Sequence, residues 1–408
     1  MQPEAGSSAR RGLRRLWITL ACLLAGPLVA EGALRLLLFH PNERIAALGA
    51  PLREPGLYAN PSEDAAYWKL QHVFTSPEQR RIPRFAAGLG WLGHKMVELY
   101  RDPGPPPPDD RKLVLLYGSS FAACKTPDEE CFEELVAESP QGQTARVLNF
   151  GVPGYGIDQV YMLMRETIDR YAETDPLVVI SFVIESDLDR AALSFRQRPK
   201  PLFRVVDGEP LEPSPVLEDI DEFLEREPIG IASYAWNYVL YGTELFSTKA
   251  QRSLMGSVEK RESKQELCRA LLLATRDELE ARGLDYFFLF FRDERACTDS
   301  SDEGWKATFV HELCEAERIP FIDTRAATIE FAEANDLSLS DLYIQAGHGS
   351  GHPNGIGNRA LTGSLLRGLS GARDNETLAV RAISGAADRE SRFRDEPALG
   401  LLDSARAD

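Results

Sequence analysis

Small polar residues follow a buried apolar run in the stretch Gly118–Phe121. We expect the run to be a strand and the residues after it to turn directly into a helix. A hydroxyl at the amino terminus of a helix lies where N–H groups and the helix dipole stabilise a developing oxyanion. The same small residues also suit an ordinary tight turn. Ser120 is the candidate nucleophile that this pattern offers.

Three other stretches carry complementary groups. The glycines of Asn149–Gly156 let backbone N–H groups approach a ligand closely, Glu185–Leu188 contains the hydroxyl of Ser186, and His352 stands just ahead of the last expected helix. In open parallel sheets, ligands bind outside the carboxyl ends of the strands. If these stretches meet at that edge, a hydroxyl, amide donors and an imidazole lie together. Such groups are the equipment of acyl transfer.

The elements that must position these groups alternate along the chain. Short apolar runs, buried on both faces as parallel strands are, alternate with segments of helical period. This alternation implies right-handed crossovers and a sheet covered by helices on both faces. The predicted fold class is α/β, a three-layer sandwich with a central parallel sheet. The expected strands are residues 112–117, 146–150, 177–184, 284–291 and 319–323, and the expected helices are residues 129–139, 157–171, 264–282, 305–318, 325–335 and 356–369.

These stretches resemble the sequence blocks of the SGNH (GDSL-type) hydrolases, specifically of a bacterial membrane-anchored branch. The blocks follow the family's order from Leu113 to Leu369. The most specific matches are Asn-x-Gly-x-Pro-Gly-Tyr-Gly-x-x-Gln at Asn149–Gln159 and His-Pro-Asn-x-x-Gly at His352–Gly357.

The resemblance implies a flavodoxin-like SGNH hydrolase fold and a role for each matched residue. Ser120 would be the nucleophile and His352 its general base. The N–H groups of Ser120 and Gly154 would be oxyanion donors, with the Ser186 hydroxyl as a third.

Three positions depart from the family's pattern. Gly-Asp-Ser reads Gly118-Ser119-Ser120, Asn-Asp reads Ser186-Asp187, and the acid of Asp-x-x-His reads Gly349. Loss of one oxyanion donor costs about a hundred- to a thousand-fold in rate. Asp341 could support His352 only if the intervening loop folds back. Either a Ser–His dyad works with a backbone carbonyl or a distant carboxylate as support, or the site is weakened.

The amino-terminal residues predict an export signal. Residues 1–15 are a basic cytoplasmic segment with four arginines, and residues 16–39 reach the length of a transmembrane helix if the pair Glu31 and Arg35 is tolerated. The positive-inside rule then places the rest of the chain outside the cytoplasm, anchored to the bacterial cytoplasmic membrane with the catalytic domain on the periplasmic side. The alternative is a cleaved signal peptide, with small residues around Ala30.

Composition divides the remaining chain. Residues 40–110 are expected to be a juxtamembrane region and a Pro-rich linker, and residues 111–371 the hydrolase-like domain. Within it, residues 191–263 interrupt the alternation as an insertion with a hairpin at Asp207-Gly208. The insertion is either a lid over the site or a packing excursion. The charged tail 372–408 is expected to be disordered.

Cysteine placement and charge limit the partners. Two local disulfides are conceivable in an exported chain, Cys124 with Cys131 and Cys297 with Cys314, leaving Cys268 as a buried thiol. The scattered cysteines and the glycine-spaced pair His348 and His352 predict no metal, and no cofactor is indicated. The net charge of −17, from 46 basic and 63 acidic residues, argues against a nucleic-acid partner.

The expected function is that of an extracytoplasmic serine esterase acting on O-acyl groups of an envelope glycan or lipid. Ser120 and His352 would act through an acyl-enzyme. The alternatives are an O-acyltransferase that uses the same intermediate, or a catalytically weakened relative that binds glycan or acyl groups or takes part in envelope assembly.

Overall fold

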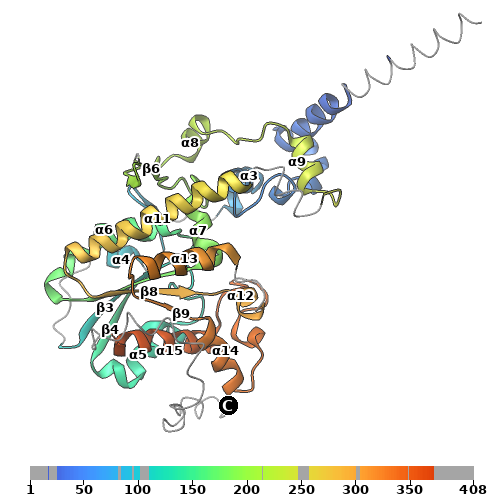
Figure 1. The fold of residues 1–408 in the computed structure, drawn as a ribbon. Coiled ribbons are helices and arrows are strands. Elements are labelled where there is room, and N and C mark those ends of the chain that lie inside the picture. The colour runs from blue at the N-terminus through green and yellow to red at the C-terminus, as the bar shows by residue number, and fades with distance from the viewer. Residues whose placement is uncertain are drawn as a thin grey trace, which may run out of the picture.

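The computed structural model describes residues 17, 25–80, 84–93, 96–101, 110–213, 215–246, 257–299, 304–347 and 349–371. Its centre is a parallel five-stranded sheet in the order β4-β3-β5-β8-β9 (Figure 1). The expected α/β class and central parallel sheet are confirmed. Because the chain order reverses between β3 and β5, the crevice outside their carboxyl ends is the topological switch point. The strands are β3 (Lys112–Gly118), β4 (Ala145–Gly151), β5 (Leu177–Val183), β8 (Tyr286–Phe291) and β9 (Phe321–Asp323).

Alternating side chains of the sheet build two cores. Leu113, Leu115 and Tyr117 of β3 face one layer of helices, whereas Val114 and Leu116 face the other. The first layer contains α6 (Ile157–Thr167), α11 (Ser257–Ala281) and α13 (Gly304–Ala316); the second contains α5 (Phe132–Glu138), α14 (Arg325–Ala334) and α15 (Gly355–Gly371) (Figure 1). The chain is a three-layer sandwich, as expected.

The region before β3 is not a mere linker. It contains α2 (Glu43–Leu48), α3 (Ala65–Phe74), the antiparallel hairpin β1 (Arg84–Ala86) and β2 (Gly90–Leu92), and α4 (Met96–Arg101). Trp91, Leu92 and Met96 are buried in the main core. The main core therefore includes side chains from before residue 111, where the sequence predicted the start of the hydrolase-like domain. The four prolines of the expected linker lie outside the described residues.

Residues 25–39 are helical, and the last turns of this helix pack against other segments of the chain. Leu34 and Leu38 contact a cluster that contains Tyr58 and Tyr234. Glu31 pairs with Arg35 at 2.6 Å and also accepts from Ser233 Oγ at 2.9 Å. No helix within the described ranges has the length and apolar character needed to cross a bilayer. Residues 16 and 18–24 of the expected anchor, and the basic segment 1–15 before it, lie outside those ranges.

The insertion follows α7 (Ile184–Ala191) and packs in three directions. Its first residues reach the loop after β4, as described below. The hairpin of β6 (Arg204–Val206) and β7 (Glu209–Leu211), turning at Asp207-Gly208 with φ of 52° and 85° as predicted, packs on α11. Beyond α8 (Ile220–Arg226), the helix α9 (Tyr234–Tyr241) packs on the amino-terminal helical segment (Figure 1).

Short helical turns complete the path of the chain. They are the 3₁₀ turns η1 (Ala50–Leu52), η2 (Pro55–Leu57), η3 (Pro77–Gln79), η4 (Asp128–Glu130), η5 (Pro140–Gln143), η6 (Ile168–Arg170), η7 (Ala172–Thr174) and η8 (Leu339–Leu342), and the short α-helix α12 (Glu294–Thr298). The tail 372–408 lies outside the described residues.

One of the two conceivable disulfides forms. Cys124 and Cys131 are bonded, with their Cα atoms 5.9 Å apart. Cys297 and Cys314 are buried free thiols, so the second bridge is wrong. Cys314 on α13 points into the main core, whereas Cys297 on α12 lies against the Tyr343 hydroxyl. Cys268 is a buried free thiol, as expected.

Candidate active site

Ser120 follows β3 at the switch point. Residues 119–123 form a turn in which the Ala123 N–H donates to the Ser119 carbonyl at 2.9 Å. The helix expected directly after Ser120 is absent from these described residues, because Cys124 takes a positive φ of 59° and ends the turn. The next α-helix, α5, begins only at Phe132. Ser120 is therefore not at the amino terminus of a helix, and an oxyanion formed there would have to be stabilised by individual N–H groups.

Two residues at the carboxyl end of β4 hold this turn in place. Asn149 Nδ2 donates to the Ala122 carbonyl at 2.8 Å, and Asn149 Oδ1 accepts from the Gly151 N–H at 2.9 Å. A Cβ on Gly151 would lie 2.3 Å from the Ala123 nitrogen, so only glycine fits. Asn149 and Gly151 therefore join the end of β4 to the turn that carries Ser120.

The loop after β4 presents Gly154 with a φ of +90°. Trp91 Nε1 donates to the Pro153 carbonyl at 3.2 Å, and the Gln197 amide lies 3.5 Å from the same oxygen. The C=O and N–H of a trans peptide point in opposite directions. Trp91 and Gln197 thereby direct the Gly154 N–H away from themselves. Neither this N–H nor that of Ser120 donates to any described residue.

Two arginines hold the next carbonyls of the loop. Arg196 Nη1 donates to the Gly154 carbonyl at 2.9 Å, and Arg190 Nη1 donates to the Tyr155 carbonyl at 3.2 Å. Arg196 comes from the insertion and Arg190 from α7. The insertion thus contacts the site at its amino-terminal end, while its hairpin and α9 pack elsewhere.

His352 lies on a tight loop between η8 and α15. The Ile344 N–H donates to the His352 carbonyl, and the Gly351 N–H donates to the Ile344 carbonyl, both at 2.8 Å. Asn354 Oδ1 then accepts from the N–H groups of Ile356 and Gly357, each at 3.0 Å, and caps α15. The His-Pro-Asn-x-x-Gly pattern thus joins an imidazole to a capped helix.

The imidazole is oriented by a backbone carbonyl. His352 Nδ1 lies 2.9 Å from the Gly349 oxygen. A carbonyl only accepts, so Nδ1 carries the hydrogen and Nε2 keeps its lone pair. The carbonyl of Gly349 is therefore one of the two supports for His352 that the sequence left open.

Asp341 is not the second support. Its carboxylate accepts from the Ser338 N–H at 2.9 Å and from the Ser338 hydroxyl at 2.6 Å. These two contacts form a capping box at the start of η8, so the Asp341 carboxylate is already engaged there. The hydrogen bonds from Ser338 lower the pKa of Asp341. The structure brings only the backbone of Asp341 into this region, where its carbonyl accepts from Asn354 Nδ2 at 2.7 Å.

Ser120 and His352 lie on neighbouring segments. The imidazole is 5.4 Å from the ring of Phe121, measured between centroids. No hydrogen bond joins Ser120 to His352 within the described residues. Ser120 is 5 % exposed. Catalytic hydrogen bonds are often long without substrate and tighten in the complex.

Ser186 is on the first turn of α7, and its hydroxyl is engaged. It donates to Asp187 Oδ1 at 3.0 Å. Asp187 is fully buried, and its other oxygen accepts from the Val183 N–H at 2.8 Å. Arg190 also donates to Asp187 Oδ1. In this arrangement the Ser186 hydroxyl and Arg190 share Asp187 Oδ1 as their acceptor.

Positive charges shift the titration of His352. Burial lowers the pKa of His352, and the charges of Lys125 and Arg190 lower it further. Burial also lowers the pKa of Lys125. For Arg196, burial and the neighbouring Arg190 lower the pKa to about 9, although Asp187 acts in the opposite direction.

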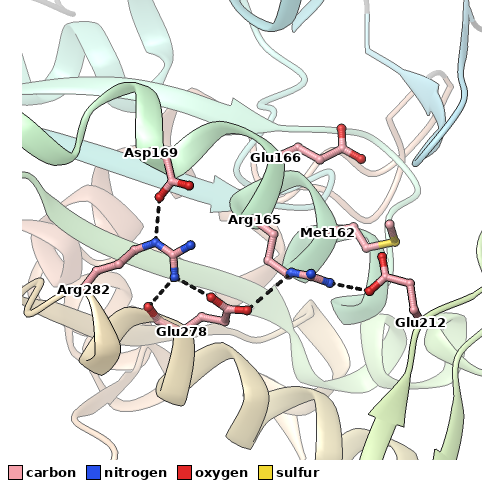
Figure 2. A pocket seen from close by; sticks show the side chains of 7 residues that line it. All are labelled: Met162, Arg165, Glu166, Asp169, Glu212, Glu278 and Arg282. Carbon is pink, nitrogen blue, oxygen red and sulfur yellow. Dashed lines mark hydrogen bonds and ion pairs between the residues drawn. The ribbon is translucent and has the colours of Figure 1, made fainter.

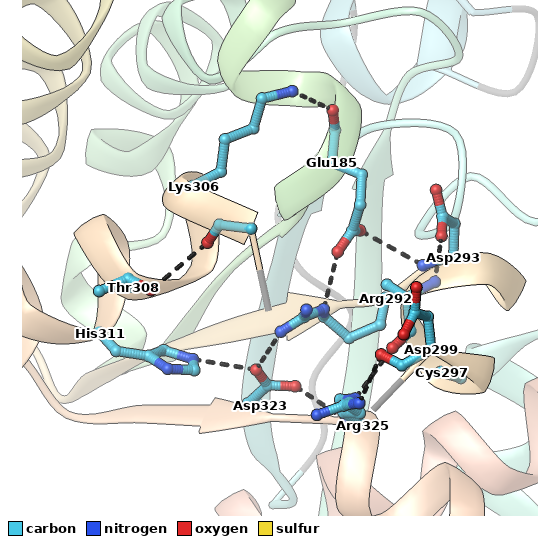
Figure 3. A network of polar contacts seen from close by, with 12 residues as sticks. Glu185, Arg292, Asp293, Cys297, Asp299, Lys306, Thr308, His311, Asp323 and Arg325 are labelled. Carbon is cyan, nitrogen blue, oxygen red and sulfur yellow. Dashed lines mark hydrogen bonds and ion pairs between the residues drawn. The ribbon is translucent and has the colours of Figure 1, made fainter. Parts of the chain in front are cut away.

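A second polar network occupies the carboxyl ends of β5, β8 and β9 (Figure 3). Arg292 donates to Glu185 Oε1 and to Asp323 Oδ2, both at 2.8 Å, and His311 Nε2 lies 2.9 Å from Asp323 Oδ2. Arg292 is 2 % exposed. In this network the carboxylates of Glu185 and Asp323 compensate the charge of Arg292, and the contacts join the ends of three strands.

The hollow shown in Figure 2 lies between α6, α11 and β7, outside the candidate site. Its two arginines are paired: Arg165 with Glu212 at 2.9 Å and with Glu278 at 3.5 Å, and Arg282 with Asp169 at 2.8 Å and with Glu278. It contains no serine, cysteine or histidine that could act as a nucleophile or base.

Sequence reasoning did not identify Trp91, Arg190, Arg196 or Lys125. Nothing in the sequence links Trp91 to Gly154, because the hairpin β1–β2 has no recognisable period. A signal did exist for the arginines: basic residues concentrate between positions 190 and 200 of a chain with a net charge of −17.

Comparisons with known proteins give distant structural similarities and no matching family. The sequence matches no protein-family model and no curated protein. Among solved structures, the chain is similar to protein YXIM of Bacillus subtilis, with 12% identity, a TM-score of 0.36, and coverage of 67% of this chain and 59% of that one.

Two esterase structures are also similar. An acetyl xylan esterase, AlAXEase, has 14% identity and a TM-score of 0.34, with coverage of 62% of this chain and 98% of that one. Axe2, an acetylxylan esterase from Geobacillus stearothermophilus, has 15% identity and a TM-score of 0.32, with coverage of 64% and 94%. At this level of similarity, a functional assignment has to rest on the geometry of the site.

Proposed function

We propose that the protein is a serine ester hydrolase of the SGNH type that acts through Ser120 and His352. One observation carries the proposal: the Gly349 carbonyl orients the imidazole of His352 beside Phe121, the residue next to Ser120. The unpaired N–H groups of Ser120 and Gly154 support it.

In the proposed reaction, Ser120 Oγ attacks the acyl carbon and its proton passes to His352 Nε2. The N–H groups of Ser120 and Gly154 stabilise the oxyanion of the tetrahedral intermediate. Collapse of the intermediate breaks the bond to the alcohol, which leaves with the proton from Nε2. Water then attacks the acyl-Ser120 ester, Nε2 takes and returns its proton, and the carboxylic acid departs.

A carbonyl in place of the triad carboxylate orients the ring but adds no full negative charge to stabilise the imidazolium. We therefore expect slower turnover than a complete triad allows. An acceptor alcohol in place of water would make the protein an O-acyltransferase. If the site is inactive, the same cleft would bind acyl or glycan groups.

We further propose an extracytoplasmic location with attachment to the membrane through the amino-terminal segment, and an envelope glycan or lipid as the source of the O-acyl group. The four arginines before residue 16 and the apolar residues after them support export. The disulfide Cys124–Cys131 supports an oxidising compartment, since such bonds are rare in the cytosol.

A fluorophosphonate probe tests the catalytic assignment. We expect stoichiometric labelling of the full chain and its loss in Ser120→Ala. The matched control is Ser119→Ala, which removes a buried hydroxyl without a hydrogen-bond partner one residue away and should retain labelling. An intact fold without labelling of the wild type, or labelling that survives Ser120→Ala, would contradict the hydrolase mechanism and favour the binding protein.

A further inference from the structure

The cations near His352 are only partly neutralised. Lys125 lies between the two disulfide cysteines, against Gly349: a Cβ on that glycine would be 3.4 Å from Lys125 Cβ. Lys125 forms no hydrogen bond or ion pair with a described residue, and it is partly buried. A desolvated ammonium without a partner is unfavourable unless something else compensates its charge.

Arg196 shows the same imbalance on the Gly154 side. Its guanidinium donates to the Gly154 carbonyl and lies 4.7 Å from the centroid of the Trp68 ring, but it pairs with no carboxylate of the described residues. Its Nε is shielded from solvent and has no hydrogen-bond partner.

Asp187, the carboxylate whose charge acts on Arg196, already has other partners. Asp187 accepts from Ser186, Arg190 and the Val183 N–H. Arg190 and Arg196 are close enough for their charges to repel each other, which costs free energy at short range. The surplus of positive charge at these residues contrasts with the rest of the chain, because the net charge of the whole chain is −17.

We propose that this cluster, defined as Lys125, Arg190 and Arg196, is an anion subsite that selects ester substrates carrying a carboxylate near the scissile bond. The inference rests on the proposed function and adds the substrate class. A guanidinium offers a planar pair of donors that matches a carboxylate. A bound carboxylate would weaken the repulsion between Arg190 and Arg196 and would give Lys125 and Arg196 a partner of opposite charge.

The carboxylate belongs to the alcohol part of the ester. His352 returns its proton to the departing alcohol, so the alcohol lies on the imidazole side of the acyl group. Lys125 and Arg190 are the cations whose charges act on that imidazole, and Arg190 and Arg196 donate to the successive carbonyls of Tyr155 and Gly154. A negative group on the alcohol would therefore lie among them.

The test compares 4-acetoxybenzoate with its neutral methyl ester, methyl 4-acetoxybenzoate, on the full chain. Both release acetate, and only the first leaves a carboxylate-bearing phenol. Arg196→Gln keeps an amide that can donate to the Gly154 carbonyl but removes the charge. Because charge-assisted hydrogen bonds are strong, we expect it to lower kcat/KM for the carboxylate ester about tenfold more than for the methyl ester.

Lys125→Met should shift the ratio of the two kcat/KM values in the same direction. The matched control is Lys112→Met, which removes a cation paired with Asp175 at the opposite end of β3 and should leave the ratio unchanged. An equal loss for both esters in Arg196→Gln would overturn the subsite and leave Arg196 as a positioning residue for the loop.

Calorimetry on Ser120→Ala separates this inference from the proposed function. The variant should bind 4-acetoxybenzoate more tightly than the methyl ester, and Arg196→Gln in the same background should abolish the difference. If the wild type hydrolyses neither ester but this difference in binding is present, the hydrolase proposal fails and the subsite stands. If neither hydrolysis nor binding distinguishes the two esters, the subsite is wrong.

Discussion

The guanidinium groups of Arg292 and Arg196 are both shielded from water near the carboxyl edge of the sheet, but their surroundings differ. Arg292 donates to Glu185 and Asp323 at 2.8 Å (Figure 3). Burial alone would lower the pKa of Arg292, and the two carboxylates outweigh it and raise that pKa. Arg196 has only a carbonyl and a ring as partners, and its pKa falls to about 9. The fold supplies carboxylate partners for Arg292, whereas no carboxylate of the described residues pairs with Arg196.

The comparison predicts opposite responses to removal of each charge. Arg292→Met leaves two largely buried carboxylates without their cation, and breaking a buried pair in this way costs about 3–5 kcal/mol. Arg196→Met removes an uncompensated charge, so the lost hydrogen bond and ring contact are offset, and the free energy of unfolding should fall by about 1 kcal/mol or less. Urea denaturation of the two variants measures the difference.

Equal destabilisation by the two substitutions would break the comparison. Arg196 would then be a structural residue whose charge the fold already accommodates. The readout does not depend on enzymatic activity, so it tests the state of Arg196 even if the chain turns over no ester.

Arg196 also donates to the Gly154 carbonyl, so the effect of its charge must be separated from its effect on the position of this loop. Trp91→Phe removes the donor to the Pro153 carbonyl and leaves Arg196 in place. With the Pro153–Gly154 peptide less restrained, we expect kcat for methyl 4-acetoxybenzoate to fall about tenfold, below the full loss of an oxyanion donor. KM should change little, because the ground-state ester makes weaker hydrogen bonds than the oxyanion.

Trp305→Phe is the matched control for Trp91→Phe. Trp305 lies on α13, stacked with Arg261 and away from the Gly154 loop. An unchanged kcat in Trp91→Phe would show that Gln197 alone orients the peptide. A rise in KM without a fall in kcat would place Trp91 in substrate binding instead.

The difference between local patterns and long-range contacts explains what the sequence could predict. The strands were recognisable because runs such as Leu177–Val183 are apolar on both faces, and a parallel sheet covered by helices requires that pattern. The motif at Asn149–Gln159 was recognisable because its first residues depend on a contact within the motif, although Asp158 and Gln159 bond to distant residues. Asn149 bonds within the motif to Gly151, and Gly151 has room for no side chain.

The features that sequence reasoning missed are long-range. The donors to the Gly154 loop come from Trp91 and Gln197, distant in the chain, and no periodic pattern marks them. The helix expected at residues 129–139 is present as α5, but the placement of Ser120 at a helix amino terminus was wrong because the positive φ of Cys124 is not visible in a run of small residues. The Gly349 carbonyl was one of two open supports for His352, and only coordinates could choose it over Asp341.

A last and smaller effect concerns the pH dependence of the proposed base. His352 must be neutral to accept a proton, so kcat/KM should rise with pH through the pKa of this imidazole. Burial, Lys125 and Arg190 lower that pKa from its ordinary 6.5, and the backbone of Gly349 and Ser350 acts in the opposite direction. The half-maximal rate should therefore lie below pH 6.5.

Lys125→Met removes one of the lowering charges without touching the carbonyl that orients His352. The midpoint of the acid limb should move upward by about half a pH unit or less, because solvent screens a partly exposed pair. Profiles of kcat/KM for the neutral methyl ester measure the shift without interference from a charged substrate. Lys112→Met should leave the midpoint in place, since Lys112 lies at the amino end of β3. A midpoint that stays fixed or moves downward in Lys125→Met would mean that the Lys125 charge does not reach the imidazole, and Lys125 would then leave the anion subsite.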